Sequence, residues 1–239
     1  MATSDATTFL PDVGELVEEA YERAGLTLRS GYDLRTARRS IDLMMLEWQN
    51  RGINLWTVEE LKYDSLGTGL GTETLVDGTS SYNLRSNTIA VLEVLLREND
   101  ENVSTQVDYE LNRISRDTHA SIPTKLTKGR PSECYVERKQ ATVTLNLWPV
   151  PDSSTKYKLV YHRVRRVEDS GPGGTYDADV PDRFWPALVS GLAYNISLKR
   201  PESVGRVQML KQLYEEQFAL AASEDREKVS VRFYPGGYS

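Results

Sequence analysis

The glycines of GTGLG, residues 67–71, have a spacing found in loops that cradle phosphate groups. Such a loop also needs either a following Lys-Ser or Lys-Thr pair or a surrounding βαβ unit, and the sequence provides neither. We therefore interpret residues 67–71 as a turn-rich loop, with nucleotide binding as the alternative. The similar stretch SGPGG, residues 170–174, is interpreted as a hinge between a strand and a helix.

The residues that most often act as nucleophiles or metal ligands are scattered along the chain. His119 and His162 have no Cys or second His at the spacing of a zinc site. Cys134, the one cysteine, lies in no nucleophile elbow, and a single cysteine excludes an internal disulfide framework. We predict no catalytic residue, no metal site and no cofactor.

Acidic residues occur in adjacent pairs, such as Glu18 with Glu19 and Glu215 with Glu216. Adjacent acids on helices and turns usually belong to solvated faces, whereas a glycosidase holds two carboxylates across a cleft. The catalytic alternative is a hydrolase in which acids such as Glu98 or Asp108 act in a cleft of the β-region.

The stretch HRVRR, residues 162–166, is the densest basic cluster of the chain. Alternate side chains of a strand point to opposite sides, so Arg163 and Arg165 share one side and Arg166 lies on the other. The cluster is either a charged strand end paired with acids such as those at positions 168 and 169, or a contact to DNA phosphate or to an acidic partner.

The C-terminal stretch RFYPGGYS, residues 232–239, is rich in aromatic side chains. Apolar residues alternate from Val229 to Phe233, as in a strand that adds to the sheet edge of another chain with aromatic anchors. A frayed terminus is the alternative. The candidate docking residues are Val231, Phe233, Tyr234 and Tyr238.

The composition is that of a soluble globular protein, with 39% hydrophobic and 27% charged residues. A net charge of −6 gives no basic footprint for nucleic acid. No stretch approaches the ~20 apolar residues of a membrane helix, and the N-terminus lacks the regions of a signal peptide. We expect a soluble protein of a reducing compartment, without membrane contact.

Two helices are predicted near the N-terminus, over residues 12–25 and 33–51. Asp12 and Glu15 occupy the two positions of a capping box at the start of the first helix. Apolar residues recur every three or four positions in both segments, and each is followed or ended by glycine. Because the connection is short, the two helices should pack as an antiparallel hairpin.

The middle of the chain has the pattern of an antiparallel β-region. In residues 141–151 apolar and polar residues alternate, as in a half-buried strand. Residues 88–98 should form a strand with Leu92, Val94 and Leu96 on one side, paired with the following strand across a polar turn.

A second pair of helices follows the β-region. The segment 179–200 opens with a helix-start signal, but its apolar residues cover more of the helix than the single stripe of a surface helix. Such a helix can bury one side against its own chain and another against a copy. The candidate subunit-interface residues are Phe184, Trp185, Leu188, Leu192 and Tyr194.

These elements predict an α+β fold class. A helical hairpin at each end of the chain would form an antiparallel helix bundle, with a central antiparallel β-region and an extended C-terminal tail. The predicted domains are a flexible N-terminus (1–10), the helix bundle (11–52 and 181–225), an antiparallel β-domain with long loops (53–170) and the tail (226–239).

The order of four segments resembles the bacteriophage head-to-tail adaptor, or connector, proteins of the tail tubular protein A type. No single segment is diagnostic, and the resemblance spans residues 10 to 225. The segments are MMLEWQNRGINLWTVEE, ISRDTHASIPTKLTKGRPSECYVER, LNLWPVPDSSTKYKLVYHRVRRVED and VPDRFWPALVSGLAYNISLK.

The resemblance implies a structural protein of the virion head–tail junction, made in the cytoplasm of the bacterial host. It implies a dodecameric ring that binds the portal protein, continues the DNA channel and carries a tail or nozzle protein. Residues 182–223 would join neighbouring copies, and residues 226–239 would contact the portal. The passing genomic DNA would be a partner without sequence-specific binding, and no catalytic residue is implied.

Two other function classes stand beside this one. The first is the virion-associated cell-wall hydrolase, which loss of peptidoglycan clearing on substitution of a single Glu or Asp would support. The second is a non-catalytic DNA-binding factor, which salt-dependent binding to duplex DNA would support. The net charge of −6 counts against the second class.

Overall fold

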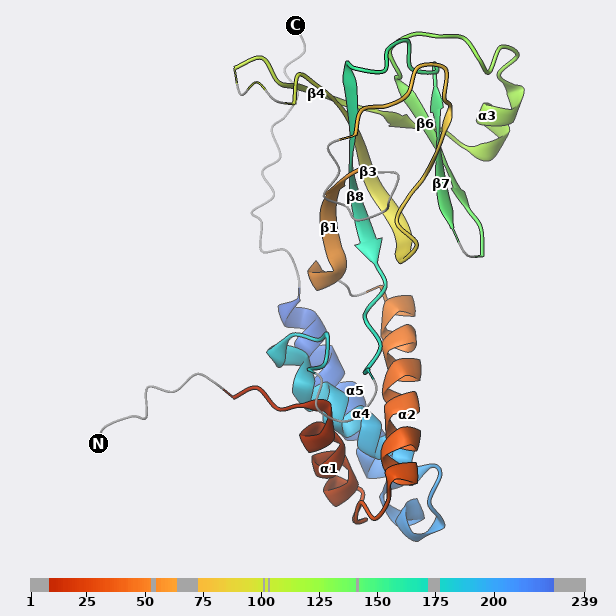
Figure 1. Ribbon diagram of the computed structural model, residues 1–239. Coiled ribbons are helices and arrows are strands. Elements are labelled where there is room, and N and C mark those ends of the chain that lie inside the picture. Colours follow the sequence, from red (N-terminus) through yellow and green to blue (C-terminus); the bar gives the residue numbers. More distant parts are fainter. Residues whose placement is uncertain are drawn as a thin grey trace, which may run out of the picture. The chain divides into compact units, whose positions relative to one another are not determined.

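Figure 1 shows the computed structural model of the chain, which describes residues 9–52, 55–63, 73–100, 102, 104–140, 142–171 and 177–225. Helices and strands are both present, so the α+β class is confirmed. The chain divides into two compact units. Residues 1–55 and 167–239 make up the helical unit, and residues 56–166 make up the β unit.

The helical unit is built from helices that come from both ends of the sequence. The predicted capping box starts the first helix, because the Glu15 amide donates to the Asp12 carboxylate at 2.8 Å and the Asp12 amide donates to Glu15 at 3.2 Å. The second helix begins earlier than predicted because Ser30 caps it. The helices are α1 (Val13–Arg23), α2 (Gly31–Asn50), α4 (Trp185–Ser197) and α5 (Val207–Glu224), with 3-10 turns η2 (Asp182–Phe184) and η3 (Pro201–Arg206).

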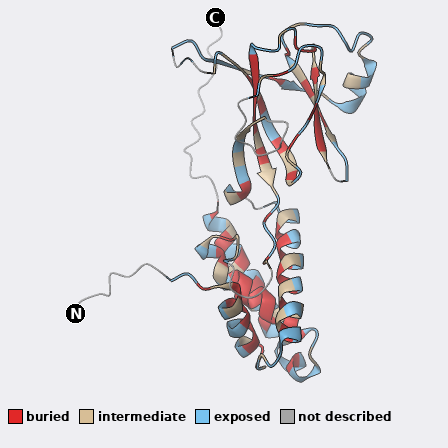
Figure 2. Ribbon diagram, in the orientation of Figure 1, coloured by how far each residue is buried: buried red, intermediate tan, exposed pale blue. Residues whose placement is uncertain are grey.

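Helix α4 is the central element of the helical unit. It packs against α1, α2 and α5, and nine of its thirteen residues are buried. Figure 2 shows this helix as the most continuously buried of the helices. The broad apolar surface of α4 is therefore covered by helices of its own chain.

An aromatic cluster joins α2 to η2 and α5. The Trp48 indole Nε1 donates to the Tyr214 hydroxyl at 2.8 Å, so the polar atom of a nearly fully buried side chain is satisfied. The ring centroids of Phe184 and Phe218 both lie 5.5 Å from that of Trp48. The Arg51 guanidinium covers the Phe218 ring at 4.5 Å, which places a cation over the aromatic face.

The β unit contains two sheets that share one core. Their strand orders are β1-β8-β3-β4 and β2-β7-β6-β5. All pairs are antiparallel except β5 with β6, which is parallel and corrects the purely antiparallel prediction. The strands are β1 (Val58–Lys62), β2 (Ser81–Asn83), β3 (Thr88–Glu98), β4 (Val107–Glu110), β5 (Asn112–Arg113), β6 (Glu133–Arg138), β7 (Val143–Trp148) and β8 (Tyr157–Arg165), with η1 (Leu55–Thr57) before β1 and the short helix α3 (Arg116–Ser121) after β5.

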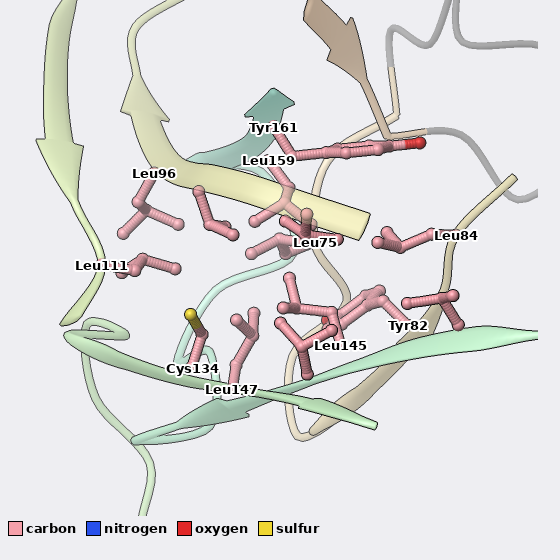
Figure 3. Close-up of a cluster of buried hydrophobic side chains, with 14 of the residues drawn as sticks. Leu75, Tyr82, Leu84, Leu96, Leu111, Cys134, Leu145, Leu147, Leu159 and Tyr161 are labelled. Carbon is pink, nitrogen blue, oxygen red and sulfur yellow. The ribbon is translucent and has the colours of Figure 1, made fainter. Parts of the chain in front are cut away.

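The core of the β unit lies between its two sheets. Figure 3 shows Leu96 and Leu159 from one sheet pointing toward Leu145 and Leu147 from the other. All four side chains are at most 1% exposed. Because both sheets bury one face in this way, the β unit has a sandwich-like core of its own.

The structure confirms some of the predicted features of the strands and contradicts one. The predicted alternation within residues 141–151 is confirmed in β7, and the predicted pairing of β3 with the next strand is confirmed as β3 with β4. The prediction for Leu92 is wrong, because this side chain is 52% exposed. The register of β3 against β8 shifts between Val91 and Glu93, and this irregularity turns Val91 and Val94 inward instead.

A buried ion network lies on one side of the β unit. Lys62 and Lys158 each donate to the Asp100 carboxylate, at 2.9 and 3.0 Å, and Arg97 donates to it at 3.3 Å. Burial by itself would raise the pKa of the Asp100 carboxyl, but the hydrogen bonds from these three cations outweigh it and hold the pKa far below its usual range. Asp100 is thus charged in the folded protein across the ordinary pH range.

Gly191 sets the distance between α4 and its neighbours. A Cβ atom at this position would lie 2.5 Å from the Met44 sulfur and 2.8 Å from the Tyr214 ring. Gly191→Ala should therefore destabilise the protein by about 1–3 kcal/mol, although alanine is the better helix former. Urea unfolding followed by circular dichroism at 222 nm measures the effect. Gly31→Ala, with nothing within 4 Å, is the matched control, and equal stability of the two variants would contradict the prediction.

Asp100→Asn should destabilise the β unit by about 1–3 kcal/mol at neutral pH, because the hydrogen bonds to charged groups are lost. The folded pKa of Asp100 is depressed, so its contribution is complete above the unfolded pKa of about 4 and declines as the pH falls further. The stability difference between wild type and variant should shrink accordingly below about pH 4. Hydrogen exchange of β3 and β8 peptides measures it.

The matched control for this substitution is Asp77→Asn. The Asp77 side chain pairs with Lys128 at 3.0 Å, but the two side chains are 42% and 57% exposed, so solvent screens the pair. This variant should leave exchange in β3 and β8 unchanged. A pH-independent effect of Asp100→Asn would show that the network does not act through the charge of Asp100.

Candidate functional site

Among the residues that the structure describes, the histidines and the cysteine have separate surroundings. His119 stacks on Tyr135 with ring centroids 5.1 Å apart, whereas His162 lies 3.8 Å from the Glu60 carboxylate. Cys134 is in the β-unit core, where burial raises the pKa of its thiol to about 11. Within the described ranges, no group of three His, Cys, Asp or Glu side chains could hold a metal ion.

The acids of the hydrolase alternative are engaged in the sheet. Arg97 donates to the Asp108 carboxylate at 2.7 Å, and this hydrogen bond, opposed by burial, lowers the pKa of the carboxyl. A catalytic acid near neutral pH needs a raised pKa instead. Glu98 sits opposite Val107 in the β3–β4 ladder. The geometry therefore gives Asp108 the character of a structural ion-pair partner.

The glycine stretches of the sequence fall mainly outside the described residues. Residues 67–71 lie outside them completely, and so do residues 172–174 of the second stretch. Gly171 is described and has a φ of 64°, a left-handed conformation that favours glycine.

The basic cluster of β8 is largely occupied within the β unit. The Arg163 side chain is fully buried and donates to Glu59 at 2.9 Å and to Thr88 at 2.8 Å. Arg165 pairs with the same Glu59 carboxylate at 2.8 Å. Arg163 and Arg165 thus share one side of the strand, and the acid between them comes from β1. Only Arg166 has an exposed side chain.

The five candidate interface residues of the second helical segment differ in exposure. Phe184, Leu188 and Leu192 have no exposed surface and pack within their own helical unit. Trp185 and Tyr194 are partly exposed. A contact between copies through this segment would therefore use Trp185 and Tyr194, whereas the other three residues stabilise the subunit itself.

The four candidate portal-binding residues, Val231, Phe233, Tyr234 and Tyr238, lie outside the described residues. The described chain ends at Asp225, which is 6% exposed. The Asp225 carboxylate accepts hydrogen bonds from Arg183 and, at 3.3 Å, from the Leu55 amide. The point from which the tail leaves the helical unit is therefore fixed.

An open groove of about 920 Å³ lies in the helical unit between α1 and the start of α4. We refer to it as the α1–α4 groove. Its apolar lining includes the buried side chains of Leu16 and Val189 and the more exposed Trp185 and Pro186. Phe9 meets the edge of Trp185, with ring centroids 5.8 Å apart, but stays 78% exposed. The groove thus presents aromatic and aliphatic surface that the described residues leave uncovered.

The polar lining of the α1–α4 groove is mostly acidic. It includes four glutamates of α1, and Arg23 and Arg183 are its cations. Glu15 belongs to the capping box and Glu19 pairs with Arg23 at 2.8 Å. Glu18 and Glu22 form no ion pair with any described residue and are exposed. The groove therefore combines an apolar surface with uncompensated negative charge.

Sequence reasoning missed this groove because its two sides are far apart in the chain. The signal that could have indicated it is the pair Phe9 and Leu10, two large apolar residues placed before the helix cap in a stretch otherwise interpreted as flexible. Their exposed fractions are 78% and 73%. Such exposed apolar surface is typical of an interaction site.

None of the helices in the described part of the chain is long and apolar enough to cross a membrane. No curated protein matches the chain at a significant level. Residues 11–234 of the 239 match the model of a protein family described as SU10 adaptor protein. The narrower similarity to the tail tubular protein A type is not tested by this match and stays a prediction.

The family match covers both units and nearly the whole chain, so it does not rest on one local motif. It agrees with the resemblance seen in the order of the sequence segments. This chain belongs to the SU10 adaptor family, a family of phage head-to-tail adaptors, which are structural proteins of the head–tail junction of the virion.

Proposed function

We propose that this adaptor forms a ring of identical subunits that binds the portal, continues the DNA channel and carries a tail or nozzle protein. The observation that supports the proposal most directly is the family match over residues 11–234. The role is assembly, and no residue is assigned to catalysis. A ring of twelve copies is the stoichiometry that the family resemblance implies.

A closed ring needs two different complementary faces on each subunit. The outer faces of α2 and α5 carry large exposed apolar side chains. Leu43 on α2 is 62% exposed, and Met209 and Leu220 on α5 are 59% and 64% exposed. We assign the ring contact to these two faces, with α2 of one copy against α5 of the next. The partly exposed Trp185 and Tyr194 of α4 remain candidates for the same contact.

The C-terminal tail, residues 226–239, is proposed to contact the portal. Ordering a segment costs about 1–2 kcal/mol of backbone entropy per residue, so several aromatic contacts are needed to offset it. Phe233, Tyr234 and Tyr238 are proposed to supply these aromatic contacts, and Val231 an additional aliphatic contact.

The channel of the proposed ring would accommodate duplex DNA without binding it. The net charge of −6 favours sliding, because a surface that repels phosphate does not hold the genome. Arg163 and Arg165 share the single carboxylate of Glu59, which offsets one of their two positive charges. Arg166 is the exposed member of the basic cluster and keeps its place as a candidate for a contact with DNA or a partner.

Deleting residues 229–239 should abolish attachment to portal-bearing heads while leaving the fold intact, because these residues follow the last described helix. Co-sedimentation with purified heads measures attachment, and circular dichroism measures the fold. Deletion of residues 2–8 is the control for loss of a terminus. Undiminished attachment of the C-terminally truncated protein would refute the portal contact.

The double variant Leu43→Cys/Leu220→Cys should cross-link into a ladder on portal-bearing heads, because each junction would bring one cysteine of each kind together. Either single variant should yield no product beyond a dimer. The longest ladder, resolved by denaturing electrophoresis, gives the number of subunits in the ring.

The control for the ladder uses Leu126→Cys. The Leu126 side chain is 73% exposed and belongs to the β unit. The pair Leu43→Cys/Leu126→Cys should give no ladder. Ladders of equal length from both pairs would mean that α2 and α5 are not the ring contact.

A further inference from the structure

We propose that the C-terminal segment, residues 226–239, binds in the α1–α4 groove of its own chain in the free subunit. The proposal concerns the isolated subunit and goes beyond ring formation and portal binding. It rests on the position where the segment leaves the helical unit, on its length and on its chemical match to the groove.

The exit of the segment is fixed beside the groove. Asp225, the residue before the segment, is held by Arg183, and Arg183 lines the α1–α4 groove. The Asp225 side chain is 1% exposed in this pair, so the start of the segment cannot move freely away from it. The segment therefore begins directly after a residue that contacts the groove lining.

The segment is long enough to follow the groove. An extended chain advances about 3.3 Å per residue, and an eleven-residue helix such as α1 is about 17 Å long. Five or six extended residues thus cover about the length of α1. The segment has 14 residues, which leaves several to bridge from Asp225 to the groove.

The side chains of the segment match the two kinds of lining. In an extended conformation Val229, Val231 and Phe233 would share one side, and Lys228 and Arg232 the other. The first side suits the apolar lining around Trp185 and Pro186, and the second suits the uncompensated glutamates of α1. Across the whole segment, Arg226, Lys228 and Arg232 outnumber the single acid Glu227.

This assignment gives the tail two alternative partners, and this consequence rests on the proposed portal contact. A tail held in its own groove is not available to the portal until the portal competes for it. The competition would delay tail exposure in the free subunit, whereas the groove contact itself requires neither portal nor ring.

The test is disulfide trapping in the full-length chain without heads or portal. Pro186→Cys places a thiol in the groove lining, and Val231→Cys places one on the apolar side of the segment. Cys134 does not interfere, because its buried thiol has a pKa raised to about 11. We expect the pair to close an intrachain disulfide, seen as a faster-migrating monomer.

The matched control is Leu55→Cys with Val231→Cys. Leu55 is 47% exposed and its amide contacts Asp225, so it lies as near to the start of the segment as the groove does, but it does not line the groove. A segment bound in the groove should close the Pro186 pair about tenfold faster than the Leu55 pair, since docking raises the effective concentration of one thiol at the other.

A charge test separates docking from chance encounter. Glu18→Gln with Glu22→Gln, added to the Pro186 pair, should slow disulfide closure several-fold, and raising the salt concentration should slow the unsubstituted pair in the same direction. Equal closure rates for the Pro186 and Leu55 pairs, or disulfides formed mainly between chains, would overturn the proposal. Loss of head attachment in the tail deletion bears on the portal contact alone, so the two proposals can fail separately.

Discussion

Helix α4 is buried against α1, α2 and α5, and the stability of the helical unit depends on this burial. α4 has no outer polar stripe of its own, so it is stable only when α1, α2 and α5 cover it. Two of these helices precede the β unit in sequence and one follows α4, which requires the two ends of the chain to meet. Gly191 permits Met44 of α2 and Tyr214 of α5 to lie close to α4. The hydrogen bond from Trp48 to the Tyr214 hydroxyl joins α2 to α5.

The β unit is stabilised differently, because charged side chains are buried within one of its sheets and must be paired there. The buried Arg163 binds Glu59 and Thr88, which ties β8 to β1 and β3, and Asp100 collects three cations from the same sheet region. Removing one member of such a network leaves a buried charge without its partner. Arg163, which the sequence offers as a possible partner contact, is thus a residue that holds strands together.

Local patterns in the sequence predicted local structure well, and the failures occur where distant segments meet. The Asp12–Glu15 capping box and the alternation in β7 depend only on neighbouring residues. The exposure of Leu92 depends on a shift in the pairing of β3 with β8, which periodicity cannot reveal. The pairing of Arg163 and Arg165 depends on Glu59, which lies 104 residues before Arg163. The wide apolar face of α4 was predicted correctly, but the sequence pattern does not indicate whether helices of the same chain or of a neighbouring subunit cover it.

Buried charged groups and exposed apolar side chains have different roles in this protein. Asp100, Arg163 and Asp225 are buried ionisable groups that each bind partners within their own unit. What remains on the helical unit is exposed apolar surface, at Phe9 and Leu10 beside the α1–α4 groove and at Leu43 and Leu220 on the outer helices. Water penalises that surface in the free subunit and releases the penalty when another segment or copy covers it. Under the proposed contacts, a neighbouring copy would cover the surfaces at Leu43 and Leu220, and the C-terminal segment would cover the α1–α4 groove.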